Sequence, residues 1–347
     1  MEISHEKLDR TFKTIAIVVI SITGLILLKD IIVPIFFAAL FSIIMLPLVK
    51  RLERRMGKIL SIMIVLLASL LTIALLMWFV ISQLASLVAS LPDLEDKFSA
   101  LIISLSASAS TYLQINSEDQ TQMLHDAIQH FSSYAGEVLV STSYLVYFFV
   151  QVPVYIFLFL LYRERFKAFL LALKPGSDLK WKDEIQSVVR GYITGLSLVV
   201  FIAGALNSIG LLILGIQHAI FFGFLSGMLT MIPYVGITIG ASLPAILALL
   251  TKDSAWYAVG VVSVHGFVQF LEANFITPKI TGSRISINAL AAIIALLLGG
   301  KIWGIAGMIL AVPLVGILKI LLSYSPTLKP FVILLGDEIN GQTTIEK

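Results

Sequence analysis

Residues 59–81 read ILSIMIVLLASLLTIALLMWFVI, a run of 23 residues without a single charge. An α-helix needs about 20 apolar residues to cross the hydrocarbon core of a bilayer. This run is long enough for one crossing, and a basic loop precedes it at residues 50–58. The stretch therefore predicts a membrane-spanning helix, and the rest of the chain can be interpreted outward from it.

The composition agrees with a membrane protein and excludes several other classes. The 347 residues are 58% hydrophobic and 13% charged, whereas soluble domains carry about 25% charged residues. A soluble enzyme and a disordered chain are both excluded. The chain has no cysteine, so disulfides and thiol catalysis are excluded as well. The net charge of +3 is too small to indicate nucleic-acid binding, and we find no motif that calls for a cofactor.

Seven further apolar runs flank residues 59–81, which gives about eight hydrophobic segments. They cover residues 14–28, 31–49, 138–162, 191–215, 219–250, 254–276 and 286–318. We therefore predict an all-α fold, a polytopic α-helical integral membrane protein.

The charged residues between these runs predict the topology. Residues 50–58 and 163–190 are rich in Lys and Arg, whereas residues 82–137 are acidic. Basic flanks favour the cytoplasmic side, so both chain termini are expected to be cytoplasmic. The expected divisions are three N-terminal transmembrane helices (1–81), an acidic extracytoplasmic helical segment (82–137), a fourth transmembrane helix (138–162), a basic cytoplasmic linker helix (163–190), a C-terminal transmembrane core (191–322) and a cytoplasmic tail (323–347).

The first candidate site lies where the run 219–250 contains Ile-Pro-Tyr-Val-Gly at positions 232–236. Pro233 lacks an amide hydrogen and disfavours helix at the residue before it. Gly236 and Gly240 let the backbone turn or let another backbone approach. We expect two short helices here, whose freed peptide groups could hold a ligand or ion. A simple proline kink, or a loop at the membrane surface, remains an alternative.

The second candidate break lies at Gly299, Gly300 and Lys301, inside the run 286–318. Lys301 is either a surface residue in a turn or a charge within the membrane, which is costly unless water or a partner faces it. In one model, the runs 219–250 and 286–318 each cross the membrane once. In the other, both are re-entrant hairpins with arms of about 15 residues, roughly 22 Å at 1.5 Å per residue, too short for a full crossing.

The run 254–276 is the most polar of the eight. His265, Gln269 and Glu272 are spaced at i, i+4 and i+7, which places them on one helical face, and Asn274 follows. An ionisable residue inside a membrane segment suggests a functional site. Glu272 could carry a proton, or it could form a structural ion pair with a nearby Lys or Arg. His265 alone is more typical of a packing residue than of a metal ligand.

Three motifs together resemble the AI-2E family of transporters (autoinducer-2 exporter-like). They are IPYVG at 232–236, EANFITPK at 272–279 and LGGKIWGIAGMILAVPL at 298–314. The resemblance implies a multi-pass protein of the bacterial inner membrane that contacts lipids and assembles as a homo-oligomer, with a pentamer as one option. Relatives often have His-Pro where this chain has Asn288-Ala289, so the substrate could differ from theirs.

The resemblance and the residues together favour a secondary transporter that exports small molecules, such as an autoinducer-2-like signal, on a proton or sodium gradient. The expected pathway residues are Pro233, Gly236, Gly240, His265, Gln269, Glu272, Asn274, Gly299, Gly300 and Lys301. The alternatives are a sodium–proton antiporter of the same family and a passive channel. A structural membrane protein would tolerate replacement of these residues, and an enzyme is the least favoured class because we find no catalytic constellation.

Overall fold

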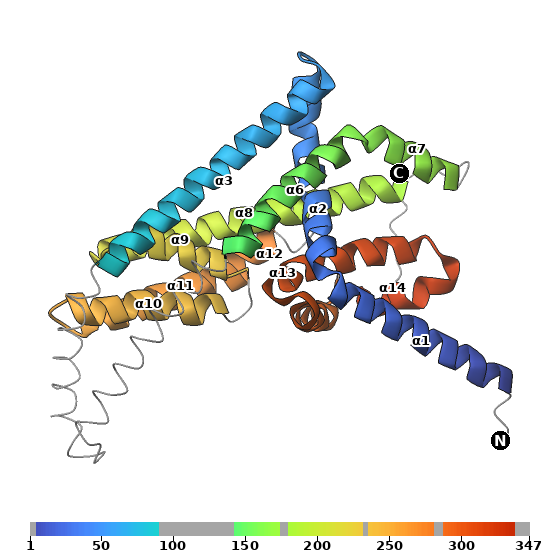
Figure 1. Ribbon diagram of the computed structural model, residues 1–347. Coiled ribbons are helices and arrows are strands. Elements are labelled where there is room, and N and C mark those ends of the chain that lie inside the picture. The colour runs from blue at the N-terminus through green and yellow to red at the C-terminus, as the bar shows by residue number, and fades with distance from the viewer. Residues whose placement is uncertain (1–4, 90–141, 174–179, 232–234, 281–286, 337–347) are drawn as a thin grey trace, which may run out of the picture. The chain divides into compact units, whose positions relative to one another are not determined.

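The computed structural model describes residues 5–89, 142–173, 180–231, 235–280 and 287–336 (Figure 1). In these ranges every regular element is helical, and strand-like pairing is limited to an isolated bridge between Ile287 and Gly336. Most of the acidic segment expected at 82–137 lies outside the described residues, because the third helix ends at Ala89.

The helices follow one another along the chain with short connections. Their bounds are α1 (His5–Leu27), α2 (Lys29–Glu53), α3 (Lys58–Ala89), α6 (Thr142–Leu161), α7 (Arg163–Leu173), α8 (Lys180–Ile213), α9 (Ala219–Leu229), α10 (Val235–Thr251), α11 (Trp256–Leu271), the π-helix η1 (Glu272–Ile276), α12 (Thr277–Ile280), α13 (Ala289–Ser323), the 3-10 helix η2 (Pro326–Leu328) and α14 (Lys329–Leu335).

Length and hydropathy mark five stretches of the described chain as candidate membrane spans. They are Lys29–Glu53, Lys58–Leu87, Lys180–Ile213, Trp256–Ile280 and Ala289–Ser323. Shorter apolar helices occur at Phe148–Leu161, Ala219–Leu229, Thr238–Thr251 and Pro326–Leu335. On α3, large apolar side chains are exposed, among them Leu71 at 62% and Trp78 at 70%. Such a surface requires lipid or protein around it, and the prediction of a polytopic α-helical membrane protein is confirmed.

The described helices form two compact units, each built from segments that are distant in sequence. Unit 1 comprises residues 1–65, 151–194 and 281–347, and unit 2 comprises residues 66–150 and 195–280. The helix α8 begins at Lys180 and continues through residue 190, where we expected a linker to end, to Ile213. A change from polar to apolar residues does not break a helix, because all of these residue types are compatible with helical φ and ψ.

In unit 1, α13 packs against both α1 and α2, and α14 packs back on α13. The indole Nε1 of Trp303 donates a hydrogen bond to the carbonyl oxygen of Leu25 at 3.0 Å, and its ring lies 5.7 Å from that of Phe36. Two long-range contacts from one side chain thus fix α13 beside the first two helices.

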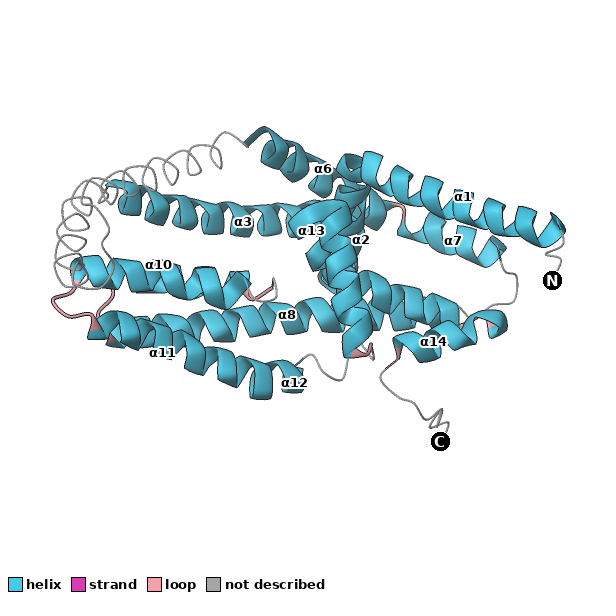
Figure 2. Cartoon of the chain, turned by 90° about the horizontal axis from the view of Figure 1, so that it is seen from below, coloured by secondary structure: helices cyan, strands magenta, loops and turns pink. Residues whose placement is uncertain are grey.

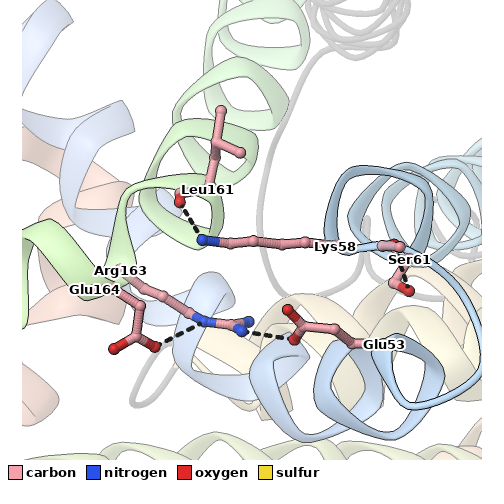
Figure 3. Close-up of polar contacts among 7 residues, drawn as sticks. Glu53, Lys58, Ser61, Leu161, Arg163 and Glu164 are labelled. Carbon is pink, nitrogen blue, oxygen red and sulfur yellow. Dashed lines mark hydrogen bonds and ion pairs between the residues drawn. The ribbon is translucent and has the colours of Figure 1, made fainter.

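A polar cluster in unit 1 joins the end of α2 and the start of α3 to the junction of α6 and α7 (Figure 3). Arg163 forms an ion pair with Glu53 at 2.6 Å and a longer one with Glu164 at 3.4 Å. Lys58 Nζ donates to the carbonyl oxygen of Leu161 at 2.6 Å. The two basic segments that we expected at the cytoplasmic side are therefore in direct contact.

In unit 2, α10 packs against both α9 and α11, and Figure 2 shows α8, α10 and α11 running alongside one another. Their shared apolar core includes Leu211, Phe221, Phe222, Leu247 and Val261. Because this core lies between α8, α9, α10 and α11, it sets the spacing of the polar residues on those same helices.

Candidate functional site

The expected break in the run 219–250 separates two helices of unit 2. The helix α9 ends at Leu229 and α10 begins at Val235, whereas Pro233 itself lies outside the described residues. With 11 residues, α9 is about 16 Å long, roughly half the ~30 Å hydrocarbon core. It is too short to cross a bilayer alone.

Glycine residues let α9 and α10 lie against each other. A methyl group at Gly236 would lie 2.6 Å from the amide nitrogen of Thr230, and one at Gly240 would overlap the side chain of Ser226. The paired positions 230 with 236 and 226 with 240 show that the two helices are antiparallel. Gly236 and Gly240 thus serve close helix contact, as their sequence spacing suggested.

On its other side, α9 contacts α8 through a second pair of glycines. A methyl group at Gly227 would lie 2.7 Å from the carbonyl oxygen of Val200, and one at Gly223 would overlap Ser208. The Ser208 hydroxyl donates to the carbonyl oxygen of Gly204 at 2.7 Å. The helix α9 is consequently held on two faces by near-backbone contacts, which fixes its position in unit 2.

The helix α11 runs antiparallel to α8. Gly260 faces Leu214, and Gly210 faces Val264. The numbers of the paired residues decrease on one helix as they increase on the other. This register places Asn207 of α8, one turn before Gly210, level with residues 267–268 of α11, between His265 and Glu272.

His265 is 3% exposed and has one hydrogen-bond partner among the described residues. Its Nδ1 lies 2.9 Å from the carbonyl oxygen of Val261. A carbonyl oxygen accepts only, so Nδ1 carries the proton and Nε2 holds a lone pair. Within the described chain, Nε2 is buried without a hydrogen-bond partner.

Glu272 is the first residue of the π-helix η1, at the end of α11. It is 9% exposed, and its Oε2 has no hydrogen-bond partner in the described part of the chain. No ion pair joins it to Lys279 there. π-helical turns are rare and frequently occur at functional sites. The structure therefore gives no support, among the described residues, to the ion-pair alternative for Glu272.

Two other residues of the expected polar face differ in their surroundings. Gln269 is half-buried. Asn274 is exposed, and its amide donates to the carbonyl oxygen of Phe270 at 2.9 Å within its own helix. Of the polar residues predicted on this segment, His265 and Glu272 are thus the two that are buried.

Sequence reasoning assigned Asn207 to helix packing rather than to the site. The structure shows it 3% exposed on α8, with Oδ1 lacking a hydrogen-bond partner among the described residues. The signal available in the sequence was a single amide in an uncharged run. Its level beside His265 and Glu272 depends on the packing of α8 against α11, which no local pattern encodes.

The break expected at Gly299, Gly300 and Lys301 is wrong in position. All three residues are helical within α13, Lys301 is exposed, and the interruption falls at Gly304, with φ 64° and ψ −144°. Only glycine adopts this conformation readily. Gly299 is needed instead where the two arms cross, since a methyl group there would lie 2.5 Å from the carbonyl oxygen of Gly307. These residues belong to unit 1.

Metal chemistry receives no support from clustered ligands in the described chain, where no three His, Asp or Glu side chains gather at a site suited to an ion. The fold and the buried polar groups of unit 2 define a class of polytopic helical membrane protein whose core carries unpaired polar atoms. Such atoms are typical of proteins that move solutes or ions.

The sequence comparisons give the particular family. The model of the AI-2E family transporter matches residues 15–326, and the chain belongs to this family. It is therefore a membrane transporter by family, as the resemblance of its motifs predicted. The family consists of transport proteins of the bacterial membrane rather than known enzymes.

Similar curated proteins cover most of the chain at modest identity. YueF of Bacillus subtilis, a candidate transport protein, is 28% identical over 82% of this chain and 82% of its own length. A candidate transport protein of Haemophilus influenzae is 28% identical over 95% of this chain and 97% of its own. The AI-2 transport protein TqsA of Escherichia coli K12 is 23% identical over 93% and 94%.

Proposed function

We propose that this protein is a secondary transporter that exports small polar solutes, including autoinducer-2-like signals, on a proton or sodium gradient. The observation that carries the proposal is the set of buried, unpaired polar atoms on Asn207, His265 and Glu272 of unit 2. A second observation, the division of 219–250 into two short antiparallel helices, favours the re-entrant arrangement.

The energetic argument starts from the cost of these atoms. A buried polar group without a hydrogen bond destabilises a protein by about 1–3 kcal/mol. Replacing such a residue with an apolar one would remove that cost, so its presence calls for a compensating role. A bound ligand, ion or water molecule that supplies the missing partner would provide it.

The chemistry of the three groups indicates what would bind. His265 Nε2 and Asn207 Oδ1 are acceptors, and Glu272 Oε2 is an acceptor when ionised and a donor when protonated. A solute with several hydroxyl groups, or a cation, satisfies acceptors of this kind. A carboxyl group that changes protonation state as the solute leaves would couple transport to a proton gradient.

Two lines of similarity support the substrate class. TqsA is named for AI-2 transport, and the chain shares its family over residues 15–326. Sodium–proton exchange is the second candidate function, since Glu272 with two neighbouring acceptors would also suit a cation. Under a passive channel, solute flux would not depend on a second gradient.

The test is transport in reconstituted vesicles, with the proton and sodium gradients imposed separately. We expect saturable solute flux that follows one gradient, and loss of that coupling in Glu272→Gln. The matched control is Glu164→Gln, the same chemical change at a side chain that is 67% exposed. If Glu272→Gln and wild type show equal flux and equal gradient dependence, Glu272 has no coupling role.

We also propose the topology and assembly that the family resemblance implies, with cytoplasmic termini and a homo-oligomer. The contact of Glu53 with Arg163 supports one membrane side for residues 50–58 and 163–190. The chain lacks cysteine, so single substitutions Arg55→Cys and Glu118→Cys can be labelled in intact cells. We expect an impermeant maleimide to react with position 118 and not with position 55.

A further inference from the structure

The helix α7 follows directly after α6 and begins with the sequence RERFKAFLLAL. Figure 1 shows that the chain changes direction between the end of α6 and α7. Phe148–Leu161 is an apolar stretch of membrane character, so α7 starts where that stretch ends. This position places α7 at the boundary between hydrocarbon and headgroups.

One face of α7 forms an open hollow of about 460 Å³. It is lined by Tyr162, Arg165, Phe166 and Phe169, whose spacing of three and four residues places them on one helical stripe. Phe166 and Phe169 are 48% and 59% exposed. An aromatic surface of this kind at a span terminus is typical of the membrane interface.

The positive charge beside this hollow is not neutralised by an acid of the described chain. Arg163 is engaged by Glu53 and Glu164 (Figure 3). Arg165 instead lies over the Tyr162 ring, with Cζ 5.3 Å from the ring centroid, and neither Arg165 nor Lys167 forms an ion pair with a described acidic residue. Two exposed cations therefore accompany the aromatic stripe.

From these observations we propose that the hollow on α7 binds a phospholipid with an anionic headgroup. Arg165 and Lys167 would bind the phosphate and headgroup, and an acyl chain would lie along Phe166 and Phe169. Charge complementarity favours this occupant over a neutral lipid, and the apolar lining favours a lipid over free phosphate. The ring of Phe159, 5.6 Å from that of Phe166, continues the apolar path from α7 onto α6. The site does not depend on the proposed transport function.

The experiment is native mass spectrometry of the purified full-length protein, titrated with phosphatidylglycerol and, separately, with phosphatidylcholine. We expect tighter binding of phosphatidylglycerol. Each basic residue near an anionic surface contributes about fivefold in affinity, so Arg165→Gln is expected to weaken phosphatidylglycerol binding about fivefold and leave phosphatidylcholine binding unchanged. Phe166→Ala with Phe169→Ala is expected to weaken both lipids.

Matched controls separate this site from general charge effects. Arg55→Gln removes the same charge from the exposed loop between α2 and α3, and Phe331→Ala removes an exposed ring from α14. Neither is expected to change lipid binding. Equal losses in Arg55→Gln and Arg165→Gln would overturn the proposal, as would equal affinity for the two lipids or competition by inorganic phosphate.

A second measurement excludes a protein partner at this face. Phe169→Cys introduces the sole thiol of the chain, and a fluorophore attached there should be quenched by brominated phosphatidylglycerol more than by brominated phosphatidylcholine. Disulfide-linked dimers in the membrane, with no quenching by either lipid, would show that a second copy covers the face and would contradict the lipid site.

Discussion

Gly299 and Gly307 lie against each other across the bend in α13. A methyl group at Gly299 would lie 2.5 Å from the carbonyl oxygen of Gly307 and 3.2 Å from Cβ of Ala311. Residues eight positions apart in a straight helix would be separated by about 12 Å along its axis. The contact therefore requires the chain to fold back at Gly304, and α13 consists of two short arms, 289–303 and 305–323, rather than one straight helix.

The bend at Gly304 gives the first prediction. A methyl group at Gly304 meets nothing within 4 Å, so Gly304→Ala creates no clash and tests backbone conformation alone. With φ at 64° and ψ at −144°, the substitution should lower the free energy of unfolding by about 1–3 kcal/mol. Denaturant unfolding in detergent micelles measures the change. Gly24→Ala, in a helix with open space, serves as control and should be neutral or stabilising.

The second prediction concerns the contact of α9 with α8. In Gly227→Ala, the new methyl group would lie 2.7 Å from the carbonyl oxygen of Val200 and 2.8 Å from the amide nitrogen of Gly204. Backbone atoms cannot move aside as a side chain can, so overpacking should cost about 1–3 kcal/mol of unfolding free energy. Gly266→Ala, a helical glycine of unit 2 with open space, is the control. Equal unfolding midpoints for the two variants would show that α9 does not approach α8 this closely.

The comparison of sequence and structure depends on whether a feature is local. Membrane segments such as 59–81 were predictable because hydropathy along a single run decides them. The interruption of α13 was predictable from glycine content, but its position was not. Gly299, Gly300 and Gly304 are equivalent in a one-dimensional reading, and the choice of Gly304 depends on the crossing of the arms at Gly299.

The candidate site shows the same division. The face of His265 and Glu272 follows from helical spacing, and both side chains are buried. Asn274 lies one helical turn from Phe270, to whose carbonyl oxygen it donates, which hydropathy and spacing do not distinguish from a site contact. The participation of Asn207 requires the register of α8 against α11, a relationship between residues more than 50 positions apart that spacing cannot supply.

The third prediction separates stability from transport at Asn207. Its Oδ1 is buried without a hydrogen-bond partner among the described residues, so Asn207→Leu removes an unfavourable group and should keep or raise the thermal unfolding midpoint. If the amide contacts the transported solute or ion, solute flux in vesicles should nevertheless fall at least tenfold, the loss expected when about 1.4 kcal/mol of binding is removed. Retention of flux at the wild-type level would remove Asn207 from the pathway.

The fourth prediction concerns the ion pair between Glu53 and Arg163. Their side chains are 26% and 17% exposed, and their atoms lie 2.6 Å apart. Hydrogen bonds to charged groups that are shielded in this way contribute about 1.5–3 kcal/mol, so a double-mutant cycle of Glu53→Gln and Arg163→Gln should give a coupling energy near the lower end of that range.

Glu164 provides the comparison for this cycle. It contacts Arg163 at 3.4 Å and is 67% exposed, and an exposed pair of that geometry contributes less than about 1 kcal/mol. The cycle with Glu164→Gln should accordingly give a smaller coupling energy that disappears in 1 M salt. Equal coupling energies in the two cycles would contradict the contact between α2 and the junction of α6 with α7.

The fifth prediction concerns Asn288, where the chain departs from the His-Pro of many relatives. Its Oδ1 accepts from the amide of Ala291 at 2.8 Å and so caps the first turn of α13. Its Nδ2 donates to the carbonyl oxygens of Leu334 at 2.7 Å and Gly336 at 3.0 Å. One side chain therefore ends two helices at once, α13 at its start and α14 at its end.

Two substitutions divide these roles. Asn288→Ala removes both and should cost about 2–3 kcal/mol of unfolding free energy, the sum of a lost cap and a lost donor. Asn288→Asp keeps the acceptor for Ala291 but removes the donor and places a negative charge beside two carbonyl oxygens. It should therefore leave α13 capped while releasing α14, which protease cleavage near residue 336 would detect. If Asn288→Asp is as resistant to cleavage there as wild type, the bond to Leu334 does not hold α14 in place.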